Sequence, residues 1–386
     1  MTQVVPPILT RPFVLVSLAS LAYFIADGVS LALVARFAMG PLGADAFGAG
    51  LVYGAFSLSA LVLRPLAGGL ADRHGRRPLM VGGALLFGAV MLAHLVAGSL
   101  AILLVLRLLL GVAEALVFVA AFAAEADLAP PSRRGEALTL FSLSLYVGIA
   151  IGPLIGEAAF SNGGFAAVWI ASAVVAGVAA LVALRVPETR PIDEPRPTSS
   201  GGLLHPAGLL TGLILMTGVW GMGGYFTLMP PYAVDSLGLD GARLFLLVFG
   251  GTVIVARLVG ARLPDRVGAR RLSGSALLLT AAGLGLMGLL PTVAGLLGGT
   301  LLLGLGVAFT TPALASLTVS LAPASQRGAA LGTFSAFIDL AFGAGPIAMG
   351  AVAATSTTPM AFLSASAVAL IGAAILWRWL RDAPPP

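Results

Sequence analysis

Several ionisable residues lie inside long apolar runs of this sequence, where a charge needs a partner or a cavity. Asp27 lies in the first run, Arg107 and Glu114 in the fourth, and Asp339 in the eleventh. A charged side chain at the centre of a bilayer costs roughly 2.5–3.5 kcal/mol on insertion scales, and such residues mark ion or proton pathways. Because protonation of an aspartate beside an arginine weakens their attraction, we expect Asp27 and Arg107 to act as a proton-coupling switch. Glu114 and Asp339 are further candidates for the same chemistry.

These residues also have a structural interpretation. Asp27 and Arg107 could form a static ion pair that only fixes helix packing. Arg107 and Glu114 are seven residues apart, so they share one face of a helix. The aromatic side chains that could line an amphipathic substrate cavity are Tyr146, Trp220, Tyr225 and Phe226. The sequence has no cysteine, and its three histidines have no partner at the spacing of metal ligands, so we expect no metal site.

The elements that must position these residues are membrane-spanning helices. Charged residues make up 10% of the 386-residue chain and apolar residues 59%, with a mean hydropathy of +1.04. A soluble domain has about 25% charged residues. Apolar runs long enough to cross a bilayer occur at about 13–36, 47–69, 79–98, 100–124, 137–160, 163–185, 207–229, 243–262, 272–291, 293–319, 328–352 and 359–380. The sequence therefore predicts an all-α membrane protein with twelve transmembrane helices.

The arginines orient these helices. All 21 basic residues are arginine, and with the N-terminus inside, sixteen fall in cytoplasmic segments, two on the opposite side and three within runs. Cytoplasmic segments of membrane proteins carry the excess of basic residues. We therefore expect a multi-pass protein of the plasma (inner) membrane with both termini in the cytoplasm. The isoelectric point near 10.4 then reflects orientation, so we expect no nucleic-acid partner.

The chain contains an internal repeat with an offset of 193 residues. Segments 128–153 and 321–346 are identical at twelve of 26 positions without a gap. The polar stretch at 186–206 is rich in proline and glycine and is typical of a linker. We therefore predict two pseudo-symmetric six-helix bundles, 1–185 and 207–386, joined by a cytoplasmic linker at 186–206. Parallel repeats of this kind place a substrate site between the halves near the membrane midplane.

The segment GGLADRHGRRP at 68–78 resembles the cytoplasmic loop signature of the major facilitator superfamily. A degenerate copy, ARLPDRVGARR, lies 193 residues later. The resemblance implies the major facilitator fold and a latch that closes the cytoplasmic side, with Asp72 facing a helix N-terminus and Arg73 or Arg134 as counter-charge. A basic loop that only fixes topology is the alternative. The expected gate residues are Gly68, Asp72, Arg73, Gly75, Arg76, Arg77, Arg134, Asp265 and Arg266.

The segment GIAIGPLIG at 148–156 resembles the antiporter signature of the family's 12-helix drug–proton branch. The matching residues are Gly148, Gly152, Pro153 and Gly156, whereas Glu157 replaces the signature's last glycine. Small residues four apart let helices approach closely, and proline can kink them. Ordinary small-residue packing is the alternative to an exporter hinge. Arg64 and Arg257, equivalent in the repeat, are expected to extend toward the cytoplasmic interface.

These features together predict a secondary active transporter. The resemblance implies proton-coupled efflux of small amphipathic or drug-like molecules by alternating access. Export of one metabolite, such as a sugar or siderophore-like compound, and import are the alternatives. The sequence has no nucleophile–base pair, metal cluster or nucleotide motif, so we expect no enzyme activity and no cofactor other than protons as coupling ion. We expect a monomer whose partners are the lipid bilayer and a small-molecule substrate.

Overall fold

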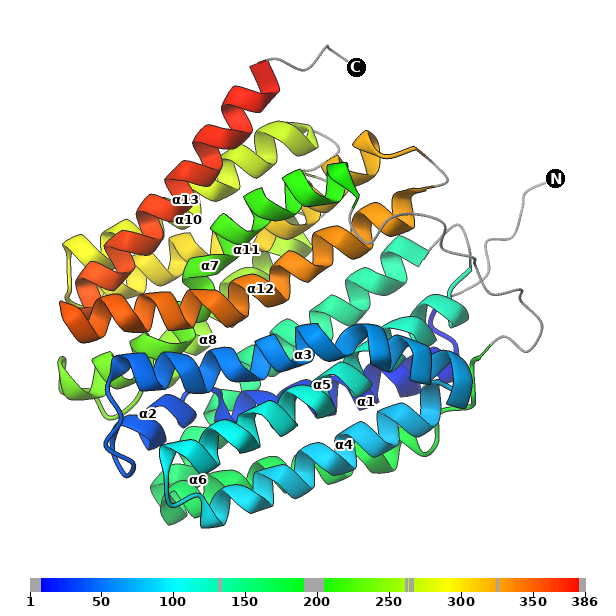
Figure 1. Ribbon diagram of the computed structural model, residues 1–386, viewed down its shortest axis with the longest axis horizontal. Coiled ribbons are helices and arrows are strands. Elements are labelled where there is room, and N and C mark those ends of the chain that lie inside the picture. The colour runs from blue at the N-terminus through cyan, green and yellow to red at the C-terminus, as the bar shows by residue number, and fades with distance from the viewer. Residues whose placement is uncertain are drawn as a thin grey trace. The chain divides into compact units, whose positions relative to one another are not determined.

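The computed structural model describes residues 8–130, 134–190, 205–260, 263, 267–323 and 326–381, which form helices and short turns without a strand (Figure 1). In the first half of the chain the helices are α1 (Arg11–Leu31), α2 (Val34–Met39), α3 (Ala46–His74), α4 (Arg76–Ala93), η1 (His94–Val96), α5 (Leu100–Leu128) and α6 (Arg134–Ala183). In the second half they are α7 (Pro206–Asp235), α8 (Arg243–Val259), α10 (Ala269–Leu289), α11 (Val293–Leu321), α12 (Arg327–Thr355) and α13 (Thr358–Arg381).

The helices account for all twelve predicted spans. Ten of the described helical stretches are long and apolar enough to cross a membrane. Helix α6 contains two helices, because Gly163 and Gly164 have non-helical backbone angles, with φ of +62° at Gly164. Helix α8 has 17 residues, at the low end of the range of about 17–25 residues that a span needs. The all-α membrane fold predicted from the sequence is therefore confirmed.

Contacts divide the chain into two compact units. The first unit contains Met1–Leu33 and Ser59–Arg196, and the second contains Val34–Leu58 and Pro197–Pro386. Residues 34–58 join the second unit because α3 packs closely on α12 there. A methyl group added at Gly50 would collide with the backbone of Pro346, and one at Gly54 with the carbonyl oxygen of Gly343. The bundle boundaries at 185 and 207 stay a prediction, and most of the linker lies outside the described residues.

The helices begin where the sequence offers caps. Thr10, Ser99 and Thr292 each accept a hydrogen bond from a backbone N–H three residues further on. Hydroxyl caps of this kind satisfy N–H groups that the first turn of a helix leaves unpaired. These starts fix the register of α1, α5 and α11, and therefore the face on which their buried residues lie.

The turn between α3 and α4 is much shorter than the sequence suggested. The helix α3 continues through Asp72 to His74, and α4 begins at Arg76, so a single residue, Gly75, separates the helices. Gly75 has φ of +100°, a conformation that residues with a side chain rarely adopt. Its repeat partner Gly268 precedes α10 with φ of +85°. The predicted runs end at 69 and resume at 79, so the connection expected over 70–78 is reduced to Gly75, while Gly68 is helical as its predicted run implied.

The second unit repeats the packing scheme of the first. Helix α12 packs extensively on α7, as α6 packs on α1, while α13 covers α7 and α10 (Figure 1). A methyl group at Gly345 would collide with the backbone of Trp220, and one at Gly152 with the backbone of Gly28. Gly152 and Gly345 are 193 residues apart, the offset of the sequence repeat. The repeat therefore preserves the helix contacts as well as the sequence.

Candidate functional site

A cluster of charged residues lies within the first unit. Its arginines are Arg64 on α3 and Arg107 on α5, and its acids are Asp27 on α1 and Glu114 on α5. Nη2 of Arg64 lies 3.2 Å from Oε1 of Glu114, and their side chains are 20% and 12% exposed. The Arg64 guanidinium carbon also lies 4.2 Å from the centre of the Phe118 ring. We call Asp27, Arg64, Arg107 and Glu114 the charged cluster.

The position of Arg64 corrects the sequence-based expectation. Arg64 was expected to extend toward the membrane interface, but its guanidinium contacts Glu114 and Phe118. The physical reason is that a long arginine side chain in a membrane helix follows the nearest carboxylate and aromatic face when these are available. Glu114 lies fifty positions further along the chain. A local sequence pattern does not predict a contact between residues this far apart.

Asp27 and Arg107 belong to the same electrostatic environment. The Arg107 guanidinium and the Glu114 carboxylate are both close enough to act electrostatically on Asp27. Arg107 is 3% exposed. The hydroxyl of Tyr23, which is 1% exposed, faces the same three charges and has no hydrogen-bond partner among the described residues. The structure thus brings Asp27, Arg107 and Glu114 together, and their role in proton coupling stays a prediction.

The remaining candidates lie elsewhere in the two units. Asp339 on α12 is 6% exposed within the second unit, and Tyr146 on α6 is 6% exposed within the first. The rings of Tyr225 and Phe226 are fully buried against Phe249, and the Tyr225 hydroxyl lies 3.1 Å from Thr300 Oγ1. In this conformation Tyr225 and Phe226 pack α7 against its neighbours. Their role in a substrate cavity, like that of the half-buried Trp220, stays a prediction.

The glycines of the 148–156 motif face α1. Methyl groups added at Gly148, Gly152 and Gly156 would collide with the backbone of α1 at Phe24, Gly28 and Val29, respectively. Glycines at this spacing let two helix backbones come into direct contact. Pro153 lies within α6 on the same stretch. We call this contact between α1 and α6 the glycine seam. Asp27 directly precedes Gly28, one of the α1 residues in this contact.

Arg76 is the centre of the polar network at the turn between α3 and α4. Its Nη1 donates to Oδ1 of Asp72 at 3.1 Å, and its Nε donates to Oδ2 of Asp127 at 3.1 Å. Arg76, four residues after Asp72 and across the break at Gly75, is thus a counter-charge of Asp72, and only 10% of its side chain is exposed. The expectation of Arg73 or Arg134 as counter-charge stays a prediction. The side chain of Arg134, and all of Asp265 and Arg266, lie outside the described residues.

Glu125 and Asp127 both lie near the end of α5 but have different partners. The Glu125 side chain is buried and accepts a 2.9 Å hydrogen bond from Ser17 Oγ on α1. Asp127 does belong to the network, because it also accepts a hydrogen bond from Thr189 Oγ1. Residues two positions apart on a helix point to different faces, so Glu125 and Asp127 contact different neighbours.

Glu188 was missed by the sequence analysis. Its carboxylate accepts hydrogen bonds from the backbone N–H groups of Arg76 at 2.8 Å and Arg77 at 3.2 Å, and so caps the N-terminus of α4. It also accepts from the N–H groups of Thr189 and Arg190. Burial acts to raise the pKa of Glu188, but these four donors outweigh it, and the pKa lies below its usual range. The only signal in the sequence was an acidic residue just after a predicted span.

Glu188 therefore makes stability depend on pH. A carboxylate whose pKa is lowered by folding contributes stability above its unfolded pKa of about 4.3, and this contribution is lost as the pH falls through the folded value. We expect Glu188→Gln to lower the thermal unfolding midpoint of the purified protein at neutral pH. The difference from wild type should shrink below about pH 4.3. Asp240→Asn, in an exposed turn of the second unit, is the control; a pH-independent effect of Glu188→Gln would contradict the capping role.

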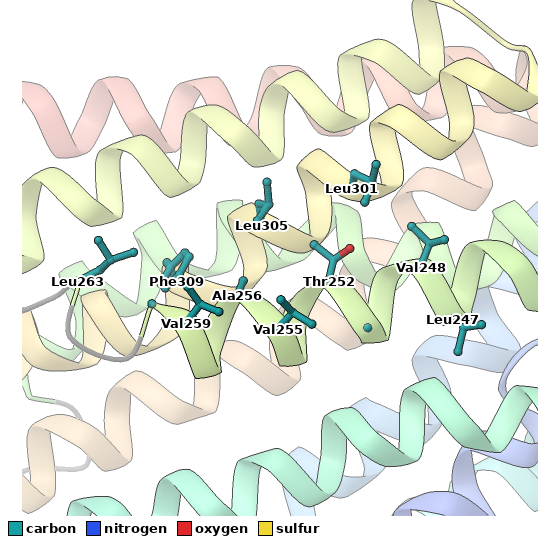
Figure 2. Close-up of a pocket in the computed structure, with 12 residues that line it drawn as sticks. Leu247, Val248, Thr252, Val255, Ala256, Val259, Leu263, Leu301, Leu305 and Phe309 are labelled. Atoms are coloured by element: carbon teal, nitrogen blue, oxygen red, sulfur yellow. The ribbon is translucent and has the colours of Figure 1, made fainter.

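An apolar cavity of about 730 Å³ lies in the second unit between α8 and α11 (Figure 2). Its lining residues are Leu247, Val248, Gly251, Thr252, Val255, Ala256, Val259, Gly260, Leu263, Leu301, Leu305 and Phe309. Thr252 supplies the single side-chain hydroxyl of this lining. Ligand sites usually combine an apolar wall with a few convergent polar groups. The cavity and the charged cluster therefore offer different chemistry, each within its own unit.

Comparison with known proteins gives the family. The family model of the Major Facilitator Superfamily matches residues 15–271 and 242–386. An MFS-type transporter of Salmonella typhimurium, itself uncharacterized, is 29% identical over 382 residues, covering 95% of this chain and 96% of that protein. An uncharacterized MFS-type transporter of Burkholderia mallei is 32% identical over 377 residues, covering 94% and 90%.

Solved structures agree with this fold. A bacterial homologue of the human lysosomal transporter Spinster, in an inward-facing and occupied conformation, has a TM-score of 0.80 at 15% identity, covering 96% of each chain. The human organic anion transporter MFSD10 has a TM-score of 0.72 at 22% identity, covering 96% of this chain and all of that one. These similarities confirm the predicted major facilitator fold with its two domains. The chain is a multi-pass membrane protein and belongs to the Major Facilitator Superfamily.

Proposed function

We propose that this transporter exports small amphipathic or drug-like molecules in exchange for protons. The observation that carries the proposal is the charged cluster. Its two acids and two arginines lie within helices long and apolar enough to span a membrane, where ionisable groups are retained chiefly for moving ions, protons or substrates. Protonation of either acid changes the charge balance of the cluster, which provides a means to favour one conformation over another.

The glycine seam supports the choice of export. The motif glycines hold α6 against α1 along the stretch that carries Asp27, so a change at Asp27 acts directly on that contact. The sequence of the motif resembles the antiporter signature of the drug–proton branch. Asp72 at the end of α3, Arg76 at the start of α4 and Asp127 at the end of α5 form the proposed latch. Alternating access, a location in the plasma (inner) membrane with both termini cytoplasmic, and a monomeric state complete the proposal.

The direction of coupling can be tested in proteoliposomes. We expect vesicles with an acidic interior to accumulate substrate, because protons leave as substrate enters in the exchange reaction. A protonophore should bring the accumulation ratio back to about one. Uptake driven by an acidic exterior instead would indicate import with protons, and uptake unaffected by any pH gradient would contradict proton coupling.

The breadth of substrates needs a separate measurement. A panel of unrelated dyes, drugs, sugars and chelators can be screened in the same vesicles with and without the gradient. Gradient-dependent transport of several unrelated amphipathic compounds would support a multidrug role. Transport of one compound alone would favour export of a specific metabolite.

A further inference from the structure

The Arg64 guanidinium occupies a site that other side chains of the first unit build around it. The Glu114 carboxylate lies 3.2 Å from the guanidinium on one side, and the Phe118 ring lies 4.2 Å below its central carbon. A carboxylate combined with an aromatic face is the chemistry that binds planar, delocalised cations. The protein thus holds one of its own cations in a position that suits an external one.

This site has more hydrogen-bonding capacity than Arg64 uses. Oε1 of Glu114 accepts from Arg64, but Oε2 of the same carboxylate is buried and has no hydrogen-bond partner among the described residues. Buried polar atoms are usually paired. A ligand with several N–H groups on one plane would satisfy the oxygen that the resting protein leaves unpaired.

Aromatic rings connect the site to the surface of the first unit. Phe118 stacks on Phe122 with ring centres 6.1 Å apart, and Phe24 meets Phe118 edge to face at 6.4 Å. Phe122 is 40% exposed and the Arg64 side chain 20% exposed. The partly exposed Phe122 ring thus gives an aryl group on the ligand a face to stack against.

We propose that Glu114 and Phe118 form a binding site for aryl amidinium or aryl guanidinium cations, and that Arg64 occupies this site when no ligand is bound. The proposal rests on the proposed function, because it names the chemical class of the cargo. An arriving cation displaces Arg64 from Glu114 and Phe118. The ligand takes the place of the arginine as the cation beside Glu114, and the displaced Arg64 keeps its charge, so the complex carries one more positive charge than the free protein.

Binding can be measured on the purified full-length protein in detergent without any gradient. The probe is benzamidinium, and benzamide is its neutral isostere. Arg64→Leu should bind benzamidinium about tenfold or more tightly than wild type, because the ligand no longer competes with a charge-assisted hydrogen bond. Its thermal unfolding midpoint should also rise more on adding benzamidinium, since a ligand that binds only the folded state stabilises it.

A double variant provides the matched control. Arg64→Leu with Glu114→Gln removes both charges, which avoids the unpaired buried carboxylate that could prevent Arg64→Leu from folding. This double variant should bind benzamidinium no better than benzamide, whereas wild type should prefer benzamidinium. Phe118→Leu should weaken benzamidinium binding several-fold through loss of the cation–aromatic contact.

Three results would overturn the proposal. In the first, wild type binds benzamidinium and benzamide with equal affinity. In the second, the double variant still prefers benzamidinium. In the third, a folded Arg64→Leu variant binds benzamidinium no more tightly than wild type. Because these measurements use no gradient, a failure of proton-driven transport in vesicles would reject the proposed function and leave the binding result unaffected. Proton-driven transport without benzamidinium binding would reject the site alone.

Discussion

Replacing Asp27 by asparagine should abolish proton-driven accumulation while leaving exchange of substrate down its own gradient. The asparagine keeps the size and hydrogen-bonding groups of the side chain but cannot bind or release a proton. With one proton exchanged per substrate, a gradient of one pH unit supports at most about tenfold accumulation, because one pH unit corresponds to ~1.4 kcal/mol. We therefore expect the accumulation ratio in vesicles with an acidic interior to fall from this range to about one.

Equilibrium exchange separates loss of coupling from loss of structure. Asp27→Asn should still exchange labelled for unlabelled substrate across vesicles without a gradient. Asp240→Asn, on an exposed turn of the second unit, should accumulate substrate like wild type. Full gradient-driven accumulation by Asp27→Asn would show that Asp27 and Arg107 only fix helix packing, the alternative that the sequence left open.

The second large effect is expected at the glycine seam. A methyl group at Gly152 would lie 2.5 Å from Cα and the carbonyl carbon of Gly28, so α1 and α6 would have to move apart along their whole contact. Overpacking by even one methyl group usually costs about 1–3 kcal/mol, and a rigid backbone on the other side leaves no side chain to adjust. We expect Gly152→Ala to lower the thermal unfolding midpoint and Gly152→Leu to prevent recovery of folded protein.

Gly177→Leu is a matched control in the second of the two helices of α6. Gly177 also lies in α6, but no atom lies within 4 Å of a methyl group added there. This variant should purify as well as wild type and unfold at a similar temperature. If Gly152→Leu gave a monodisperse protein with an unchanged midpoint, the close contact between α1 and α6 would not be needed for the fold.

The sequence predicted the helices well because their signals are local. The spans follow from hydropathy, and the turn at Gly163 and Gly164 falls where one predicted run ends and the next begins. The predicted run at 207–229 ends just before Pro230 and Pro231, which lie inside α7. Membrane helices accommodate internal prolines when their neighbours satisfy the freed backbone groups, and α7 continues to Asp235.

The candidate site was less predictable because its contacts are distant in sequence. Asp27, Arg107 and Glu114 were recognised because a charge in an apolar run is conspicuous in any single sequence. The pairing of Glu114 with Arg64 depends on how α3 packs against α5, which hydropathy does not determine. The internal repeat also led to a wrong expectation, because it made Arg64 and Arg257 equivalent. In the second half the position equivalent to Glu114 is Val307, which cannot pair with an arginine.

The contacts of Glu188 and Arg190 lie at the protein surface, whereas the Arg64–Glu114 contact lies in the interior of the first unit. Glu188 holds the N-terminal end of α4, and Arg190 donates to the backbone carbonyls of Asp72 and Arg73 at the end of α3. These partners lie at the protein surface, where charges are screened over about 8 Å at physiological ionic strength. The Arg64–Glu114 pair is largely shielded from dissolved salt. Rising ionic strength should therefore loosen the attachment of the chain after α6 before it affects the interior of the transporter.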